Sequence, residues 1–174
     1  MSVPFEPVAF DGRRTVPSVR VRALIVELLQ LTESDKVLEI GTGSGTQTHD
    51  FGSTGAMVHS IELEPWIDTS KIIGDCVYLH AGNGIAGLPE CAPFSAIVAT
   101  CGIEQIPDTW RDQLSDGGRL VVPIGEQSGQ RLVLFRKHGS ELIPEKVAAY
   151  VRFSMMKEPP KRNPPKYQPN EIHG

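Results

Sequence analysis

Glycines alternate with small hydroxyl residues directly after a short apolar run, near residue 40. Residues 36–40 (KVLEI) predict a buried strand, and residues 41–45 (GTGSG) follow at once. Glycine has no side chain, so a backbone rich in it turns tightly and approaches a ligand closely. We therefore expect a binding loop at the end of this strand. Its expected ligand contacts are Glu39, Gly41, Thr42, Gly43, Ser44 and Gly45.

The spacing of these glycines bears on the ligand. The pattern is G-x-G-x-G, whereas the dinucleotide fingerprint is G-x-G-x-x-G, and Glu39 lies two residues before the first glycine. This favours S-adenosylmethionine over a nicotinamide cofactor. S-adenosylmethionine has a zwitterionic amino acid end and a ribose with two free hydroxyls.

A second acid follows the glycines at the distance a ribose ligand requires. Residues 56–62 (AMVHSIE) predict a strand that ends in Glu62. In a parallel sheet, an acid roughly 20 residues after the glycine loop lies at the end of the adjacent strand and binds the ribose hydroxyls. We expect Glu62 to hold the ribose, with Leu63 beside it.

Two further strand ends complete the predicted site. Residues 76–81 predict a strand that ends in Gly82-Asn83-Gly84, a turn that permits close approach of the backbone. Residues 94–100 predict a central strand, and its last residue, Thr100, opens into the crevice where such sheets bind ligands.

The elements that must position these residues alternate between strand and helix. Apolar residues at helical spacing predict a helix over 18–31, and short helical stretches are expected after the loop (48–55) and over 65–71. A helix over 107–114, closed by Asp116-Gly117-Gly118, precedes a strand over 119–124. Residues 131–137 and 146–153 predict an antiparallel pair at one edge.

These elements make one Rossmann-like, doubly wound α/β domain with a mostly parallel, seven-stranded sheet and an antiparallel edge pair. We assign residues 16–156 to it, residues 1–15 to an irregular N-terminal arm, and residues 157–174 to a proline-rich, extended or disordered tail. With 174 residues, the chain is too short for a cofactor domain plus a separate substrate domain, which excludes a two-domain dehydrogenase.

Charge and cysteine content exclude other classes. The net charge of −4 gives no overall attraction to nucleic acid or to an anionic membrane. Cys76, Cys91 and Cys101 are odd in number and lack C-x-x-C spacing, so neither a disulfide framework nor a metal site is expected. With no signal sequence or long apolar run, we expect a cytoplasmic protein.

Three blocks of sequence together resemble the protein-L-isoaspartate O-methyltransferase family: residues 37–48, 87–97 and 114–127, the last containing Val-Pro-Ile-Gly-Glu-Gln. The similarity covers roughly residues 15–154. It implies a class I methyltransferase fold, with S-adenosylmethionine as methyl donor. It also implies that the acceptor is the carboxylate of an L-isoaspartyl residue in a damaged protein or peptide.

The chain departs from this family at several points: Thr46 stands where Tyr is usual, the helix after Glu62 is shorter, and two further differences concern the expected site. The family usually has Thr-x-Ser-x-Pro ahead of the first helix, and this chain has Thr15-Val16-Pro17-Ser18-Val19, with proline in the serine's place. Ser18 is then the candidate catalytic hydroxyl, and a helix N-cap is its other expected role. The family's Gly-Asp-Gly at the adenine is Gly82-Asn83-Gly84, in which Asn83 keeps a carbonyl acceptor.

Methyl transfer to a carboxylate needs little acid–base help, because the acceptor, with a reference pKa near 4, is already ionised at neutral pH. The protein has to hold oxygen, methyl and sulfur in line.

Two alternatives to this function remain. The protein could be a methylase of another peptide or small carboxylic acid, or a binding module without turnover. Asn163-Pro164-Pro165 resembles a nucleic-acid methylase motif, but Lys166 stands where the aromatic should be, and we expect no nucleic acid.

Overall fold

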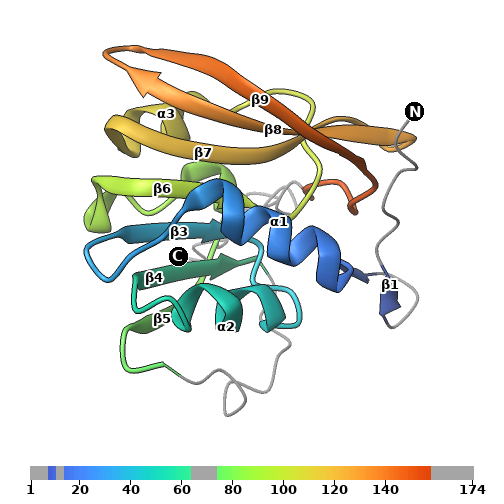
Figure 1. Ribbon diagram of the computed structural model, residues 1–174, viewed down its shortest axis with the longest axis horizontal. Helices are drawn as coiled ribbons and strands as arrows, with labels where there is room; N and C mark the ends of the chain where they lie inside the picture. The colour runs from blue at the N-terminus through green and yellow to red at the C-terminus, as the bar shows by residue number, and fades with distance from the viewer. Residues whose placement is uncertain (1–7, 11–13, 64–73, 158–174) are drawn as a thin grey trace, which may run out of the picture.

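The computed structural model describes residues 8–10, 14–63 and 74–157, and its centre is a seven-stranded sheet (Figure 1). The strand order is β5-β4-β3-β6-β7-β8-β9. The strands are β3 (Lys36–Ile40), β4 (Met57–Glu62), β5 (Val77–Ala81), β6 (Phe94–Ala99), β7 (Leu114–Glu126), β8 (Gly129–His138) and β9 (Glu141–Val151). Neighbours from β5 through β7 are parallel, and β7, β8 and β9 form an antiparallel meander. The predicted fold class is confirmed.

Helices cover both faces of this sheet. The helices α1 (Val19–Leu29) and α2 (Thr46–Gly52) lie on the face toward the viewer in Figure 1. The helix α3 (Asp108–Gln113) and two single 3₁₀ turns, η2 (Gly84–Ala86) and η3 (Pro89–Cys91), belong to the opposite face. Each face of the sheet has its own hydrophobic core. On β3, Val37 packs into the core under α1 and α2, whereas Leu38 and Ile40 pack into the core under α3. This alternation follows from the two-residue period of a strand.

The predicted helix over 18–31 is confirmed with slightly narrower bounds. The Ser18 hydroxyl accepts a hydrogen bond from the Val21 N–H at 3.3 Å, and this cap fixes where α1 begins. The helix ends at Gln30, in the left-handed region with φ of 45°. An ion pair of 2.7 Å between Arg22 and Asp50 joins α1 to α2.

Two expectations about local structure are wrong. Part of the supposed irregular arm forms an antiparallel pair, β1 (Val8–Phe10) with β2 (Arg14–Val16). The glycines Gly117 and Gly118 do not close a helix, because β7 already begins at Leu114 and runs through them. Its pairing with β6 slips there from Phe94–Leu114 to Ala96–Arg119, so the glycines form an irregularity inside the strand.

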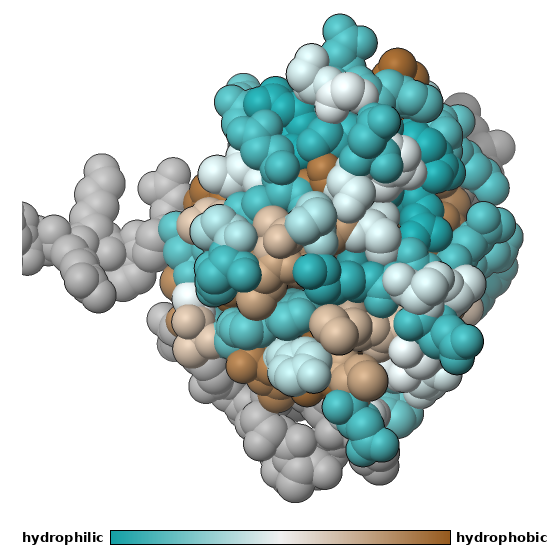
Figure 2. Space-filling view, turned by 90° about the vertical axis from the view of Figure 1, so that its left-hand side faces the viewer, coloured by the Kyte–Doolittle hydropathy of each residue, from teal (hydrophilic) through white to brown (hydrophobic). Residues whose placement is uncertain are grey.

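Most apolar side chains of the sheet are buried, and one face of the molecule shows the result. The view from the left-hand side of Figure 1 is mainly hydrophilic, with smaller hydrophobic groups between (Figure 2). Within the described residues, no helix combines the length and hydropathy needed to span a bilayer. The helical turn expected over 65–71 and almost all of the predicted tail lie outside the described residues.

Candidate functional site

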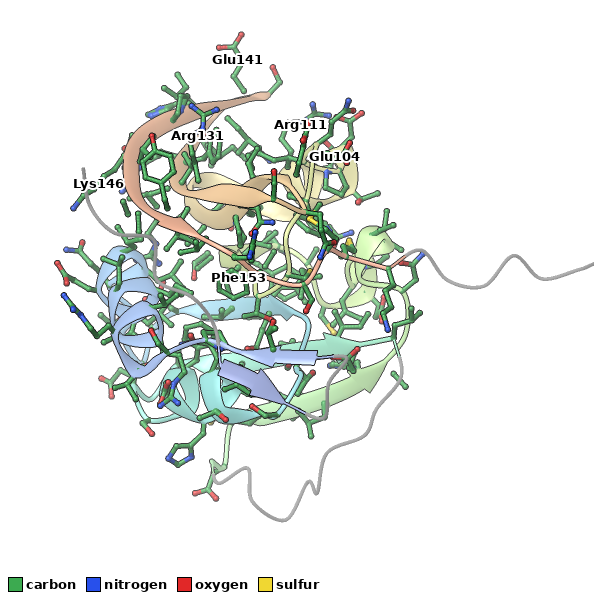
Figure 3. All side chains as sticks on the ribbon, turned by 90° about the vertical axis from the view of Figure 1, so that its right-hand side faces the viewer. Glu104, Arg111, Arg131, Glu141, Lys146 and Phe153 are labelled. Atoms are coloured by element: carbon green, nitrogen blue, oxygen red, sulfur yellow. The ribbon has the colours of Figure 1, made fainter. Side chains whose placement is uncertain are left out.

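A cavity of about 150 Å³ opens at the carboxyl ends of β3, β4 and β6. Figure 3 views the molecule from the right-hand side of Figure 1, and there the chain beyond β9 passes near the centre at Phe153. The predicted site residues that line the cavity are Gly41, Thr42, Gly43, Ser44, Glu62, Leu63, Asn83, Gly84 and Thr100. Four segments far apart in sequence therefore meet at the carboxyl ends of the strands, where the sequence predicted the site.

The glycine loop shapes the wall of this cavity. Gly41 has φ of +96°, and a Cβ there would lie 2.8 Å from Thr100 Oγ1, so only glycine fits. Gly43 has φ of +53°, and a Cβ there would meet nothing within 4 Å. The missing side chain at Gly43 thus leaves open space beside the loop for a ligand. Gly45 is the N-cap of α2 and does not line the cavity.

Glu62 ends β4 and holds the loop to it. Its Oε2 accepts a hydrogen bond from the Gly43 N–H at 2.9 Å, and its Oε1 accepts one from the Leu63 N–H at 3.0 Å. Each carboxylate oxygen can accept more than one hydrogen bond, so both retain capacity toward a ligand. The geometry suits an acid that binds two neighbouring hydroxyls.

Glu39, by contrast, is fully buried and does not line the cavity. The Ser60 hydroxyl, 2.6 Å away, and the Thr48 hydroxyl donate to its Oε2, and Thr42 Oγ1 lies 2.6 Å from Ser60 Oγ. Burial raises the pKa of Glu39 to about 8, although the bonds from Ser60 and Thr48 oppose the shift. The predicted direct ligand contact of Glu39 is therefore not supported. Its side chain instead joins β3 to Thr48 on α2 and to Ser60 on β4.

Thr100 ties the end of β6 to the end of β3. Its hydroxyl is within hydrogen-bonding distance of the carbonyl oxygens of Ile40, at 3.2 Å, and Gly41. The next residue, Cys101, also lines the cavity. Burial, with a smaller contribution from Glu62, raises the pKa of the Cys101 thiol to about 12. The thiol therefore stays protonated at neutral pH and is a poor nucleophile.

Asn83 combines a cavity position with a structural bond. Its Oδ1 accepts from the Ile85 N–H at 3.0 Å and so caps η2. A carbonyl oxygen has two lone pairs, so one remains for a ligand. At Gly84 a Cβ would lie 2.6 Å from Ile40 Cγ2, which explains the glycine. Gly82, the first residue of this turn, does not line the cavity.

Several cavity residues were missed by the sequence reasoning. These are Ile40, Gln47, Ile61, Cys101, Thr15, Pro17, Ser154, Met155, Met156 and Lys157. The last four follow β9, where no glycine pattern marks a site. Gly102 holds this segment through bonds of its N–H to Ser154 O, at 2.9 Å, and of its carbonyl to Met156 N, at 2.8 Å.

The hydroxyls of Thr15 and Ser154 meet at the cavity wall. Their oxygens are 3.0 Å apart, and the Ser154 N–H donates to Thr15 Oγ1 at 3.3 Å. Ser18, the candidate catalytic hydroxyl, caps α1 and does not line the cavity, whereas Pro17 does. The structure therefore does not support the proposed substitution of Ser18 for the family's serine.

Gln47 provides a test of whether the cavity suits a polar ligand. Its side chain is 4% exposed and lines the cavity, and within the described part of the chain neither its Nε2 nor its Oε1 has a hydrogen-bond partner. Leaving such groups unpaired costs about 1–3 kcal/mol each. A ligand with polar atoms beside Gln47 would remove that cost. A zwitterionic amino acid head and a ribose fit the combination of Gln47, loop N–H groups and Glu62.

Fold and site together define the class. A parallel sheet in which β3 ends in a G-x-G-x-G loop and β4 ends in an acid that accepts a hydrogen bond from that loop has the arrangement of the Rossmann-like, class I methyltransferases. A solved Plasmodium falciparum protein, described as a protein-L-isoaspartate O-methyltransferase in complex with S-adenosyl-L-homocysteine, has this fold. It is similar to the chain with a TM-score of 0.74 and 20% identity, over 87% of this chain and 79% of that one.

The comparisons of sequence identify a single family within this class. The family model for protein-L-isoaspartate(D-aspartate) O-methyltransferase matches residues 4–158. A curated Trichlorobacter lovleyi protein-L-isoaspartate O-methyltransferase is 37% identical over 153 residues, which are 84% of this chain and 70% of the relative. The chain belongs to the protein-L-isoaspartate(D-aspartate) O-methyltransferase family, and S-adenosylmethionine is the cofactor of that family.

A second solved protein-L-isoaspartate O-methyltransferase is 28% identical, with a TM-score of 0.76. The match covers 87% of this chain but only 52% of that one. The chain thus spans about half the length of this solved relative.

Proposed function

We propose that this protein transfers a methyl group from S-adenosylmethionine to the free carboxylate of an L-isoaspartyl residue in damaged proteins or peptides. The observation that carries the proposal is the bond from the Gly43 N–H to Glu62 Oε2, because it joins the glycine loop to the strand-end acid at one cavity. Family membership and the nucleoside bound by the Plasmodium falciparum relative support it.

Named residues would hold the donor. Glu62 accepts the ribose hydroxyls, and Gln47 and the loop N–H groups receive the amino acid head. By the family resemblance, Asn83 lies at the adenine and uses its free lone pair. When bound, the donor supplies an electrophilic methyl group on a sulfonium.

The Thr15 and Ser154 hydroxyls are our candidates for orienting the acceptor. They lie 3.0 Å apart at the cavity wall, beside Pro17, where the family usually has serine. A carboxylate with a pKa near 4 arrives already ionised, so the hydroxyls need only donate hydrogen bonds to it. Holding the reacting atoms in line can lower the activation barrier by on the order of 7–11 kcal/mol. The protonated Cys101 thiol takes no part as a base.

The direct test compares two peptides that differ only in one linkage. The protein is incubated with methyl-labelled donor and an isoaspartyl peptide, beside its normal aspartyl twin. Base-labile label on the isoaspartyl peptide alone is expected, because the product is a methyl ester. Label on neither peptide would contradict the proposed acceptor.

Calorimetry separates the remaining readings. If the donor binds but the isoaspartyl peptide is not methylated, other carboxylic acids are tested as acceptors. Label on one of them would indicate a methylase of another carboxylate, and label on none would indicate a binding module without turnover. Pro17 favours testing these two alternatives, because it replaces the serine hydroxyl that the family usually has at this position. No donor binding at all would refute every methyltransferase reading.

We also propose a cytoplasmic location and no nucleic-acid partner. The free thiols of Cys76, Cys91 and Cys101 suit a reducing compartment, and the net charge of −4 opposes general attraction to nucleic acid. Cell fractionation and a nucleic-acid mobility-shift assay test the two statements.

A further inference from the structure

Away from the cavity, two imidazoles and a thiol meet near the β5 edge of the sheet. His59 lies on β4, His80 on β5, and Cys91 ends η3. One ligand atom from each residue lies within 4.8 Å of the other two, and His59 Nδ1 is 3.0 Å from His80 Nε2. None of the three lines the cavity. The sequence did not show this group, because its members come from three separate elements without a spacing motif.

We propose that His59, His80 and Cys91 form a binding site for Zn²⁺. Imidazole nitrogen and thiolate sulfur are the preferred ligands of this ion, and three protein ligands leave a fourth position for water. Tetrahedral Zn²⁺ with ordinary bond lengths separates two nitrogens by about 3.3 Å and a nitrogen from a sulfur by about 3.6 Å. The imidazoles thus need to part by a few tenths of an ångström, and the thiol to approach by at most about 1.2 Å.

Aromatic neighbours hold the His59 ring. It stacks against Tyr78 and His80, with centroids 5.0 and 5.3 Å away, and meets Phe94 edge-on at 5.9 Å. His59 is buried, whereas His80 and Cys91 are half-buried. The site is therefore fixed on one side and open to an ion from solvent on the other.

The local charges are balanced. Burial lowers the pKa of His59, as do His80 and Lys36, and Glu90 opposes them. A neutral imidazole is the form that binds metal. Lys36 Nζ donates to the Cys91 carbonyl oxygen at 2.7 Å, so a positive charge lies next to the group. Lys36 repels a dication, but the thiolate and Glu90 offset that repulsion.

A bound ion would fasten the edge of the sheet. Within the seven-stranded sheet, β5 pairs with β4 alone, and η3 follows it along the chain. An ion held by all three elements would stabilise the folded state by an amount that rises with the logarithm of the ion concentration, because the unfolded chain does not present the ligands together. The role assigned to the ion is structural.

The first experiment uses Co²⁺ as a coloured substitute for Zn²⁺. Titration of the intact, reduced protein should produce one equivalent of bound Co²⁺ with thiolate-to-cobalt charge-transfer absorption, and Zn²⁺ should displace it. Cys91→Ser should remove that absorption, and His80→Gln should weaken binding at least tenfold. The matched controls Cys76→Ser and His138→Gln alter residues outside the group and should match the parent.

The second experiment measures the melting temperature with and without Zn²⁺. The parent and Cys76→Ser should gain stability from the ion, and Cys91→Ser should gain none. Circular dichroism and S-adenosylhomocysteine binding show that each variant is folded, and both are independent of the metal readout. Absence of thiolate absorption in the parent, or equal absorption in Cys91→Ser, would overturn the proposal.

Discussion

At the scale of single residues, the two acids of the site have different roles that their sequence positions did not distinguish. Glu62 lines the cavity and accepts from the Gly43 N–H, while Glu39 is buried and contacts Ser60 and Thr48. Each acid lies at a plausible distance from the glycines, one before them and one after, so only the structure separates the acid that lines the cavity from the buried one.

Replacement of Glu62 by alanine should weaken S-adenosylhomocysteine binding about 10- to 100-fold. Hydrogen bonds to a charged group contribute about 1.5–3 kcal/mol, and the loop also loses the acceptor of the Gly43 N–H. Isothermal titration calorimetry measures the change. Glu104→Ala, at an exposed position outside the cavity, is the control (Figure 3). Parental affinity in Glu62→Ala would refute the proposed ribose contact.

Asn83→Asp should bind the donor product at least as well as the parent. The carboxylate can still accept from the Ile85 N–H, and it restores the residue that the family usually has at this position. Asn83→Ala, which loses the cap, should be less stable by about 1 kcal/mol. Calorimetry and urea unfolding test the pair, and clearly weaker binding by Asn83→Asp would contradict the adenine assignment.

At the scale of elements, the cavity depends on the segment after β9, which is held by a buried side chain as well as by its bonds to Gly102. Gln130, on β8, accepts from the Phe153 N–H at 2.7 Å and donates to Glu126 O at 2.6 Å. It is 2% exposed. These bonds fix the path of the chain after β9, which then places Ser154 and Met155 at the cavity.

Gln130→Ala should therefore affect stability and methyl transfer together. Loss of the buried partner of the Phe153 N–H should cost about 1–3 kcal/mol of unfolding free energy. The displaced Ser154 should lower turnover of an isoaspartyl peptide more than it lowers donor affinity. Urea unfolding and steady-state kinetics measure the two effects, with Gln127→Ala at an exposed turn as control. Unchanged turnover would show that the segment does not position the acceptor.

The sequence predicted those elements whose structure is determined by residues close to them in the chain. The strands that end at Ile40 and Glu62 and the helix capped by Ser18 have their signals within a few residues. The course of β7 through Gly117 and Gly118 depends on pairing with β6, and the placement of Ser154 depends on Gln130. Such long-range contacts leave no local pattern, so they were missed.

At the scale of the whole molecule, one buried group links the site to global stability. Glu39 is fully buried on the middle strand of the parallel part, and burial raises its pKa from 4.5 to about 8. The folded protein therefore binds this proton more tightly than the unfolded chain does. The contribution of the protonated carboxyl is complete below about pH 4.5. It is lost as the pH rises through about 8.

Glu39→Gln should remove this dependence, because glutamine keeps the shape and does not titrate. The unfolding free energy of the parent relative to Glu39→Gln should fall by on the order of a few kcal/mol between pH 5 and about pH 8.5. Urea unfolding across that range measures the difference. Glu27→Gln, which makes the same substitution on the exposed side of α1, is the control. A pH-independent difference between the parent and Glu39→Gln would mean that Glu39 is already ionised in the fold, with its charge stabilised by Ser60 and Thr48.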